Sequence, residues 1–258
     1  MVNLFNILSL SIVIIFYEAF PTFPTFLTSA LPWLYETGIL SRRSNAKTLK
    51  LEACMATVSF TQMKHGTRED YQLLHQHEES FHGKTAQRLL AELKRQGQDS
   101  LDGYPISRLE HSLQSATRAW RDNANDDWIV AALLHDIGDG LAPQNHDRMA
   151  AEIIRPFVSE EVTWVIEHHG AFQMIYYAHH IDGWNPNDRD QYAGHSYYQS
   201  AVDFCERWDQ NCFEPDYENQ SLEFFAPFLE RVFARKAYAQ KTIKAGEVSG
   251  LPIINHAL

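Results

Sequence analysis

Histidine and aspartate residues follow one another between positions 111 and 209 in an order that could bind metal ions. The ordered set is His111, His135, Asp136, His146, His169 and Asp209. Neutral imidazole is a good ligand for divalent iron, manganese, zinc or nickel, and a carboxylate can bridge two cations. Because Asp136 directly follows His135, one chain segment can give a ligand to one metal and a bridging oxygen to its neighbour. The set predicts a two-metal site with coordination positions open for water, substrate or dioxygen.

Two members of the set have neighbours that could take their place. A single histidine on a helix is more often a packed, hydrogen-bonded core residue than a metal ligand, so the prediction rests on the ordered set. His169 falls on the apolar face of its expected helix, whereas His168 could lie behind it. Asp209 competes with Asp203 on one expected helix, and its position near the helix end favours Asp209.

Hydrophobic periodicity and capping residues place the six side chains at or near helix ends. No alternating pattern typical of strands occurs, so we expect an all-α chain. Helices are expected over residues 69–96 with breaks at Gly83 and Gly97, 106–120, 128–138, 146–157, from the cap Ser159 through 169, 196–209 and 221–236, with a turn-rich insertion at 179–195. One face of the expected helix 106–120 carries Leu109, Leu113, Ala116 and Trp120.

The sequence phrases around the ordered set resemble those of the HD-domain superfamily of metal-dependent phosphohydrolases and oxygenases. These phrases are RLEHSLQSA, AALLHDIGD, QNHDRMAAEII, VIEHHG and ERWDQ, within residues 104–210. The resemblance implies an HD-domain helical bundle around a dinuclear metal site. It also implies that one metal is bound by His111, His135 and Asp209, the other by His146 and His169, and that Asp136 bridges them.

The phrases LEHSLQ and LHDIGD are most similar to the mixed-valent diiron oxygenases, which include phosphonate-cleaving enzymes and, more distantly, myo-inositol oxygenase. This similarity implies two iron ions (Fe2+/Fe3+) and oxidation by O2 of a small polar substrate, such as a hydroxylated molecule with a phosphonate or amine group. The alternative is a phosphohydrolase that acts on a nucleotide or phosphomonoester with Mn2+ or another divalent metal. A metal-stabilised binding module without turnover is a third interpretation, which the complete ligand set disfavours.

Several positions near the expected metals depart from the phosphonate-cleaving enzymes. Leu101 and Tyr104 stand where those enzymes have a Tyr and a Glu, Asp139 replaces a substrate-facing His, and Gln173 replaces a Lys. We expect Tyr104, Asp139 and Gln173 to contact the substrate, and Tyr104 and Asp139 to act beside Asp136 in catalysis. The competing interpretation is that they are solvated or structural polar residues. An acidic Asp139 suits a cationic or polyhydroxylated substrate better than a phosphonate.

The charge balance disfavours nucleic acid and anionic membranes as partners. The formal net charge of the 258 residues is -11, and no Lys/Arg-rich run offsets it. Arg108 and Arg148 are expected to pair with nearby carboxylates rather than to bind an anion. The three cysteines are odd in number and lack a CxxC spacing, which argues against a disulfide framework and a cysteine-type zinc site. A reducing, cytoplasmic location is therefore expected.

The first 54 residues differ in composition from the remainder. We expect them to form an N-terminal extension, and we expect the metal-dependent domain over residues 55–258. Residues 4–17 are an apolar run that is shorter than the roughly 20 residues needed to span a bilayer. Three interpretations stay open: a secretory or organelle targeting segment within residues 1–30, a membrane anchor, or an upstream stretch absent from the working protein. Contact with a membrane is expected only if residues 4–17 are retained.

Overall fold

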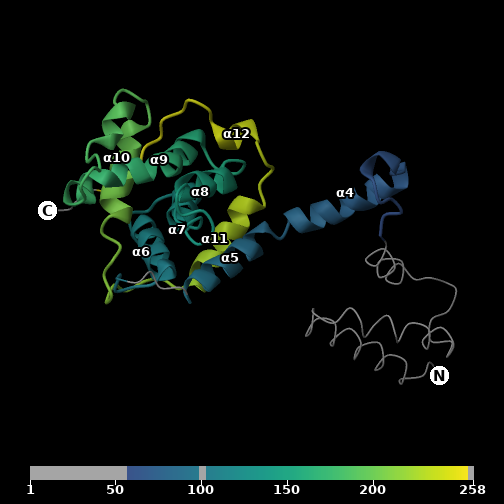
Figure 1. Cartoon of the computed structure of the whole chain (residues 1–258), viewed down its shortest axis with the longest axis horizontal. Coiled ribbons are helices and arrows are strands. Elements are labelled where there is room, and N and C mark those ends of the chain that lie inside the picture. Colours follow the sequence, from purple (N-terminus) through teal and green to yellow (C-terminus); the bar gives the residue numbers. More distant parts are fainter. Residues whose placement is uncertain (1–56, 99–102, 255–258) are drawn as a thin grey trace, which may run out of the picture. The chain divides into compact units, whose positions relative to one another are not determined.

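The computed structural model describes residues 57–98 and 103–254, and the regular secondary structure in these ranges is helical throughout (Figure 1). This confirms the expected all-α class. The expected extension over residues 1–54, with its apolar run, lies outside the described residues. The chain divides into two compact units, Met1–His77 and Glu78–Leu258. In the described part of the chain, no helix combines the length and the hydropathy that crossing a bilayer requires.

The described part of the first unit is organised by one carboxylate. It contains the 3-10 helix η1 (Met63–His65) and the beginning of α4 (Arg68–His82). Asp70 accepts hydrogen bonds from the backbone N–H groups of Ser59 and Thr67, at 2.8 and 2.9 Å. The charge of Asp70 also lies in the first turn of α4, where it is favourable to the helix dipole.

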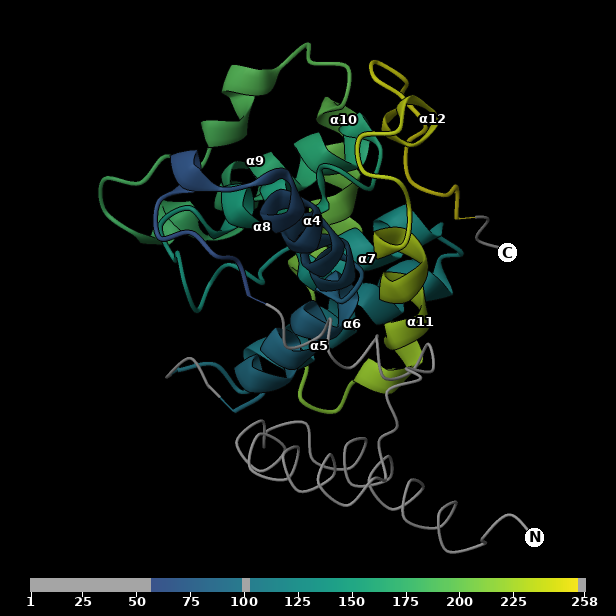
Figure 2. The ribbon, with the colours of Figure 1, turned by 90° about the vertical axis from the view of Figure 1, so that its right-hand side faces the viewer.

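The second unit is a bundle of helices around the apolar helix α7. Its helices are α5 (Thr85–Gln96), α6 (Arg108–Arg121), α7 (Asp126–Leu134), α8 (His146–Ile154), α9 (Glu160–Tyr177), α10 (Tyr198–Phe204), α11 (Leu222–Phe233) and α12 (Gln240–Ile243). Residues 128–134 of α7 are all buried, and this helix packs against α6, α9 and α11 (Figure 2). Because α7 has almost no solvent-facing side, its sequence is nearly all apolar.

Side-chain caps begin the helices that carry the site. Ser107 and Glu110 form a reciprocal capping box at the start of α6, and Asn125 caps α7. The expected cap of α9 at Ser159 is confirmed, because its side chain accepts a hydrogen bond from a backbone N–H of the first turn. Each cap satisfies backbone groups that have no partner inside the helix, and it fixes where the helix begins.

Helix α7 ends at Leu134, whereas the sequence predicted an end near Gly138. The reason is a tight turn: the N–H of Ile137 donates to the carbonyl of Leu134, and the N–H of Asp139 donates to that of Asp136. Both bonds span three residues, as in a 3-10 turn rather than an α-helix. The turn allows the residues after α7 to point their side chains in directions that one helical face would not allow.

A π-helical turn, η4 (Cys205–Asp209), replaces the end of the helix expected over residues 196–209. The N–H of Gln210 donates to the carbonyl of Cys205 at 3.0 Å, and this i→i−5 bond defines the wider turn. Phe204 and Trp208 are fully buried beside it. Single π-turns are frequent at functional sites, and this one ends on Asp209.

The turn-rich insertion expected over residues 179–195 is confirmed, although α9 extends to Tyr177, beyond its predicted end. The insertion contains the 3-10 helices η2 (Ala178–His180) and η3 (Asp188–Tyr192). Its imidazole His195 stacks on Trp164 of α9, with ring centroids 4.1 Å apart and an interplanar angle of 4°. This ring contact holds the end of the insertion against the helix that carries His169.

Candidate metal centre

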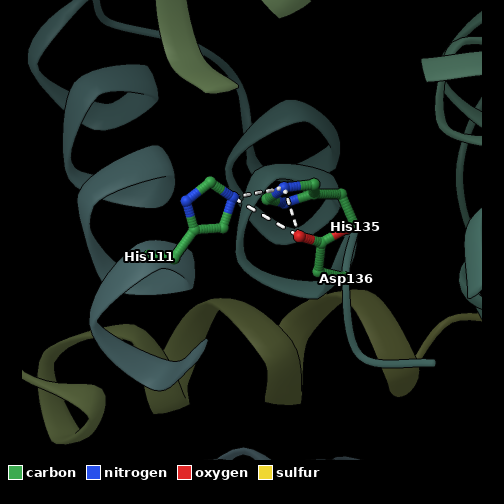
Figure 3. Close-up of side chains that lie close together, drawn as sticks. All are labelled: His111, His135 and Asp136. Carbon is green, nitrogen blue, oxygen red and sulfur yellow. Dashed lines mark hydrogen bonds and ion pairs between the residues drawn. The ribbon is translucent and has the colours of Figure 1, made fainter. Parts of the chain in front are cut away.

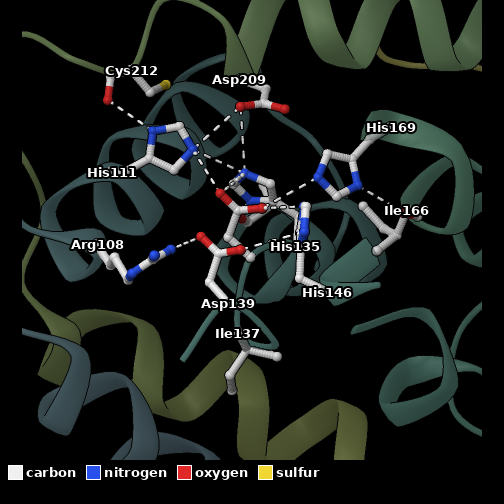
Figure 4. Close-up of polar contacts among 12 residues, drawn as sticks. Arg108, His111, His135, Ile137, Asp139, His146, Ile166, His169, Asp209 and Cys212 are labelled. Carbon is white, nitrogen blue, oxygen red and sulfur yellow. Dashed lines mark hydrogen bonds and ion pairs between the residues drawn. The ribbon is translucent and has the colours of Figure 1, made fainter. Parts of the chain in front are cut away.

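The six predicted ligand residues lie together, although they come from five separate segments of the chain (Figure 4; Asp136 is labelled in Figure 3). The segments are α6 with His111, the end of α7 and the following turn with His135 and Asp136, the start of α8 with His146, the middle of α9 with His169, and η4 with Asp209. His111 Nε2 lies 3.2 Å from an oxygen of Asp209 and 3.0 Å from His135 Nε2. The cluster is largely enclosed, since His135 is 0% and His169 2% exposed.

Asp136 lies between two groups of histidines. Its Oδ2 atom is 3.4 Å from His111 Nε2 and 3.5 Å from His135 Nε2 (Figure 3). Its Oδ1 atom is 3.4 Å from His146 Nε2 and 3.2 Å from His169 Nε2. Each carboxylate oxygen therefore faces one group, which is the arrangement that a bridging carboxylate needs.

Each of the four histidine rings is held in place by a backbone carbonyl at its Nδ1 atom. The Nδ1 partners are the carbonyls of Cys212 for His111 (3.0 Å), Ala132 for His135 (2.8 Å), Pro143 for His146 (3.3 Å) and Ile166 for His169 (2.7 Å). Because a carbonyl only accepts, Nδ1 carries the proton in each ring, and the Nε2 atom faces the centre. Metal-binding histidines are typically fixed in this way.

The polar atoms at the centre fit a pair of cations. With both Nδ1 protons given to carbonyls, the Nε2 atoms of neutral His111 and His135 would face each other as two acceptors at 3.0 Å. The Oδ2 atom of Asp209 is buried and has no hydrogen-bond partner among the described residues. Metal ions between these atoms would satisfy both the imidazoles and the carboxylates, so the donor set suits the two metals that the sequence predicted.

The carboxylates and imidazoles of the centre shift one another's pKa values when no metal is bound. Burial opposes protonation of His169, but the hydrogen bond and charge of Asp136 outweigh burial and raise the pKa of His169 to about 9. Burial also opposes protonation of His111, and the carboxylates of Asp209 and Asp136 nevertheless raise its pKa. Burial alone would raise the pKa of both carboxyls, yet the histidines, with the charge of His135 foremost, hold both below their ordinary value.

Metal binding at this centre is expected to strengthen as the pH rises toward about 9. A cation binds the neutral imidazole, so it must displace the proton that His169 holds below its pKa of about 9. One displaced proton increases the apparent affinity about tenfold per pH unit, and the gain ends above the pKa. Calorimetric titration of the metal-free chain with Mn2+ at several pH values measures the slope. An affinity that does not change between about pH 6 and 8 contradicts the expectation.

Gly138 allows the turn after α7 to touch the beginning of α8. A Cβ atom at this position would lie 2.7 Å from the carbonyl oxygen of His146 and 2.8 Å from its Cα atom. Both are backbone atoms, so they cannot swing away as the end of a flexible side chain could. The missing side chain of Gly138 therefore sets the distance between two ligand-bearing segments.

Replacing Gly138 with alanine is expected to displace His146 and to weaken the binding of one metal. Overpacking of this kind lowers the free energy of unfolding by about 1–3 kcal/mol. Denaturant unfolding and metal titration measure the two effects. The matched control is Gly140→Ala, whose Cβ would meet the terminal guanidinium of Arg95, which can rotate away. Equal stability and equal metal affinity of the two variants would show that the contact at Gly138 is unimportant.

A cavity of about 110 Å³ opens beside the centre. Its lining residues are Tyr104, Ile106, Ser107, Arg108, His111, Asp136, Asp139 and Phe213. One wall is aromatic: the ring centroid of Phe213 lies 4.7 Å from that of His111 and 5.3 Å from that of Tyr104. Two of the expected substrate contacts, Tyr104 and Asp139, thus lie next to metal-ligand candidates.

Asp139 does not present an isolated negative charge to this cavity. The guanidinium of Arg108 pairs with one of its oxygens, and the other lies 3.4 Å from Nδ1 of His146. The side chains of Arg108 and Asp139 are only 15% and 17% exposed. The expected pairing of Arg108 with a carboxylate is confirmed. The pair is close to neutral, which removes the main reason to expect a cationic substrate.

Two positions that the sequence placed near the substrate are not among the described residues that line the cavity. Gln173 lies one turn beyond His169 on α9, but it is not among the described residues that line the cavity, so its substrate contact stays a prediction. Leu101 lies outside the described residues. Phe213, which lines the cavity, was missed because it follows η4 in an irregular segment that carries no motif.

The neighbours that competed for ligand positions have other partners. The ring of His168 stacks on Trp164 at 4.4 Å between centroids, and its Nδ1 bonds to the carbonyl of the same residue. Asp203 accepts a hydrogen bond of 2.7 Å from Gln199 on the exposed side of α10. Neither His168 nor Asp203 belongs to a cluster that could hold a metal ion in the described residues, so His169 and Asp209 stay the predicted ligands.

Comparison with known proteins finds similarity in the part of the chain that contains most of the ligand candidates. A family model described as the HD domain matches residues 108–203. The chain is also similar to a [1-hydroxy-2-(trimethylamino)ethyl]phosphonate dioxygenase (glycine-betaine-forming) of Leisingera caerulea, with 32% identity over 88 residues. The match covers 30% of this chain and 45% of that protein, so the chain spans less than half the length of this relative.

Proposed function

Residues 108–203 form an HD domain, and from this premise we propose that the chain is an oxygenase that uses two iron ions and O2 to oxidise a small polar molecule. The observation that carries the proposal is Asp136, whose two oxygens face separate groups of histidine Nε2 atoms at 3.2 to 3.5 Å. A carboxylate placed in this way suits a bridge between two metals. The similarity to a dioxygenase supports oxidation over hydrolysis.

The roles of the ligand residues follow from the two groups. One iron would be held by His111, His135 and Asp209, the other by His146 and His169, and Asp136 would contact both. The bound irons would supply the redox chemistry that O2 needs. The carbonyl-bound Nδ1 atoms keep the four rings oriented, so that the ligands need little rearrangement when the metals enter.

The cavity residues would bind and orient the substrate. The hydroxyl groups of Tyr104 and Ser107 can donate and accept hydrogen bonds, and the paired Arg108 and Asp139 offer both kinds of group side by side. The rings of Phe213 and Tyr104 form an aromatic wall beside His111 against which the carbon skeleton of a substrate could pack. This combination suits a small molecule with hydroxyl groups.

The proposed substrate class is hydroxylated or polyhydroxylated compounds, including those that carry a phosphonate or an amine group. The similar protein is named for a substrate that carries a hydroxyl, a trimethylamino and a phosphonate group. A phosphohydrolase would instead need free cationic groups around the phosphate. Arg108 lines the cavity, but its charge is already matched by Asp139.

Metal analysis and a substrate screen test the proposal on the full chain. The chain is purified without oxygen, loaded with Fe2+, and examined by EPR after partial oxidation. We expect about two irons per chain, a mixed-valent signal, and O2 uptake with at least one hydroxylated substrate. Phosphatase activity with Mn2+ in the absence of O2, without any mixed-valent signal after iron loading, would favour the hydrolase instead.

A further inference from the structure

The face of α6 that carries His111 is polar and buried, and it is bonded to the segment that contains Asp209. Ser112, Gln114, Ser115 and Thr117 are all at most 1% exposed. Buried polar side chains need partners, because an unsatisfied group costs about 1–3 kcal/mol. Gln114 and Thr117 have their partners in Glu214 and Gln220, about a hundred positions later in the chain, whereas the hydroxyls of Ser112 and Ser115 have none among the described residues.

Both polar atoms of the Gln114 side-chain amide form hydrogen bonds with the backbone of Glu214. Its Nε2 donates to the carbonyl of Glu214 at 2.7 Å, and its Oε1 accepts from the N–H of Glu214 at 3.2 Å. Gln114 lies one helical turn after His111. The two bonds therefore hold the backbone after η4 against the part of α6 that carries a ligand.

The backbone held by Gln114 itself contacts the metal-ligand candidates. The carbonyl of Cys212 accepts the hydrogen bond from Nδ1 of His111 at 3.0 Å. The N–H of Cys212 donates to the carbonyl of Asp209, also at 3.0 Å. Movement of residues 212–214 would thus change the ring of His111 and the end of η4 together.

Asp122 fixes the other end of this contact. It follows the last residue of α6, and its Oδ2 accepts hydrogen bonds of 2.7 Å from Arg207 Nη2 and from Trp208 Nε1. Both donors belong to η4, directly before Asp209. These two contacts attach η4 to the end of α6 next to Asp209.

We infer that Gln114 and Asp122 are positioning residues, which act through Cys212 and η4 to hold His111 and Asp209 at the distance that one metal requires. The inference rests on the proposed two-metal function. The other group of ligands is held differently, since the Nδ1 atoms of His146 and His169 bond to carbonyls of Pro143 and Ile166, outside residues 207–220. Loss of either positioning residue is therefore expected to affect one metal and to spare the other.

The test is anaerobic titration of the full chain with Fe2+, with iron counted per chain and the mixed-valent EPR signal recorded. Gln114→Met keeps the length of the side chain and removes both bonds to Glu214. Asp122→Ala removes the acceptor of Arg207 and Trp208. In each variant we expect the affinity for one iron to fall by about 10–100-fold, as for other residues that orient metal ligands. The other iron stays bound, and the mixed-valent signal is lost in parallel.

Two further variants separate positioning from general destabilisation. Asp122→Asn retains an acceptor for Trp208 and is expected to recover the second iron at least in part. Arg121→Ala is the control. Arg121 donates a hydrogen bond to the carbonyl of Glu218, which lies beyond residues 212–214. This variant is expected to bind two irons like the wild type.

The outcomes distinguish this inference from the proposed function. A wild type that holds two irons, with folded Gln114→Met and Asp122→Ala chains that bind both irons equally tightly, overturns the inference alone. Loss of both irons together in the variants also overturns it, because it shows a general effect on folding. A wild type that never holds two irons overturns the proposed function itself. If Gln114→Met does not fold, the comparison of Asp122→Ala with Asp122→Asn decides.

Discussion

Replacing Asp136 with alanine is expected to leave at most one metal per chain and to abolish turnover. Its oxygens lie between two groups of histidines, so the substitution removes a ligand from both metals at once. It also removes the negative charge that offsets the repulsion between two cations. Loss of a residue that only hydrogen-bonds to a metal ligand already lowers metal affinity or activity by about 10–100-fold. Loss of the ligand that both metals share is therefore expected to lower them by more than about 100-fold. Elemental analysis after anaerobic iron loading, together with O2 uptake, measures both effects.

The chain contains a matched control for this substitution. Asp147 belongs to the second His-Asp pair of the sequence, and its carboxylate accepts a hydrogen bond of 2.7 Å from the N–H of Arg148. It belongs to none of the clusters that could hold a metal ion in the described residues. Asp147→Ala is expected to keep both metals. An Asp136→Ala variant that retains two irons and the wild-type EPR signal shows that Asp136 is not the bridge.

The helices could be predicted from the sequence because their determinants are local. The cap at Ser159 and the break near Pro156 depend on residues within a few positions of the helix end. The burial of α7 follows from its almost uninterrupted apolar sequence. The order of the ligand candidates was equally visible in the sequence, although the expectation that all six lie near helix ends is wrong for His169, which lies in the middle of α9 because this helix continues to Tyr177.

The contacts that tune the centre could not be predicted, because they join residues far apart in the chain. The spacing of hydrophobic residues predicted an apolar face on α6, and Leu109, Leu113 and Trp120 on this face do pack against the core. The opposite, polar side is nevertheless the more deeply buried one, which includes Gln114. Nothing local reveals that Glu214, 100 positions away, satisfies this amide. A polar helical face normally indicates solvent, so local reasoning assigns it to the surface.

The charge of the cavity illustrates the same limit at a single residue. Asp139 appears in the sequence as an extra carboxylate beside the site. Its partner Arg108 is 31 positions earlier, and the pairing depends on how α6 and the turn after α7 approach each other. An inference about substrate charge from one acidic residue is therefore unsafe until its neighbours in space are known.

Replacing Glu161 with leucine is expected to lower the free energy of unfolding by about 3 kcal/mol. Glu161 is 1% exposed, and its carboxylate accepts three short hydrogen bonds. The donors are Ser200 Oγ at 2.6 Å and the N–H groups of Ser249 and Gly250, both at 2.8 Å. Leucine fills a similar volume but leaves these donors without an acceptor. Ser249 and Gly250 therefore lose their hydrogen bonds to α9. Denaturant unfolding measures the change, and hydrogen exchange at Ser249 and Gly250 should become faster.

The neighbouring Glu160 is an exposed carboxylate with which the buried Glu161 can be compared. Its carboxylate also accepts two bonds, from the hydroxyl of Tyr197 at 3.0 Å and from the N–H of Gly246 at 2.6 Å. Glu160 is exposed, however, so water can replace the lost acceptor in Glu160→Leu. We expect a loss of about 1 kcal/mol or less for that variant. If both substitutions lowered the free energy of unfolding equally, burial of the Glu161 carboxylate would not determine how much its bonds to Ser249 and Gly250 stabilise the protein.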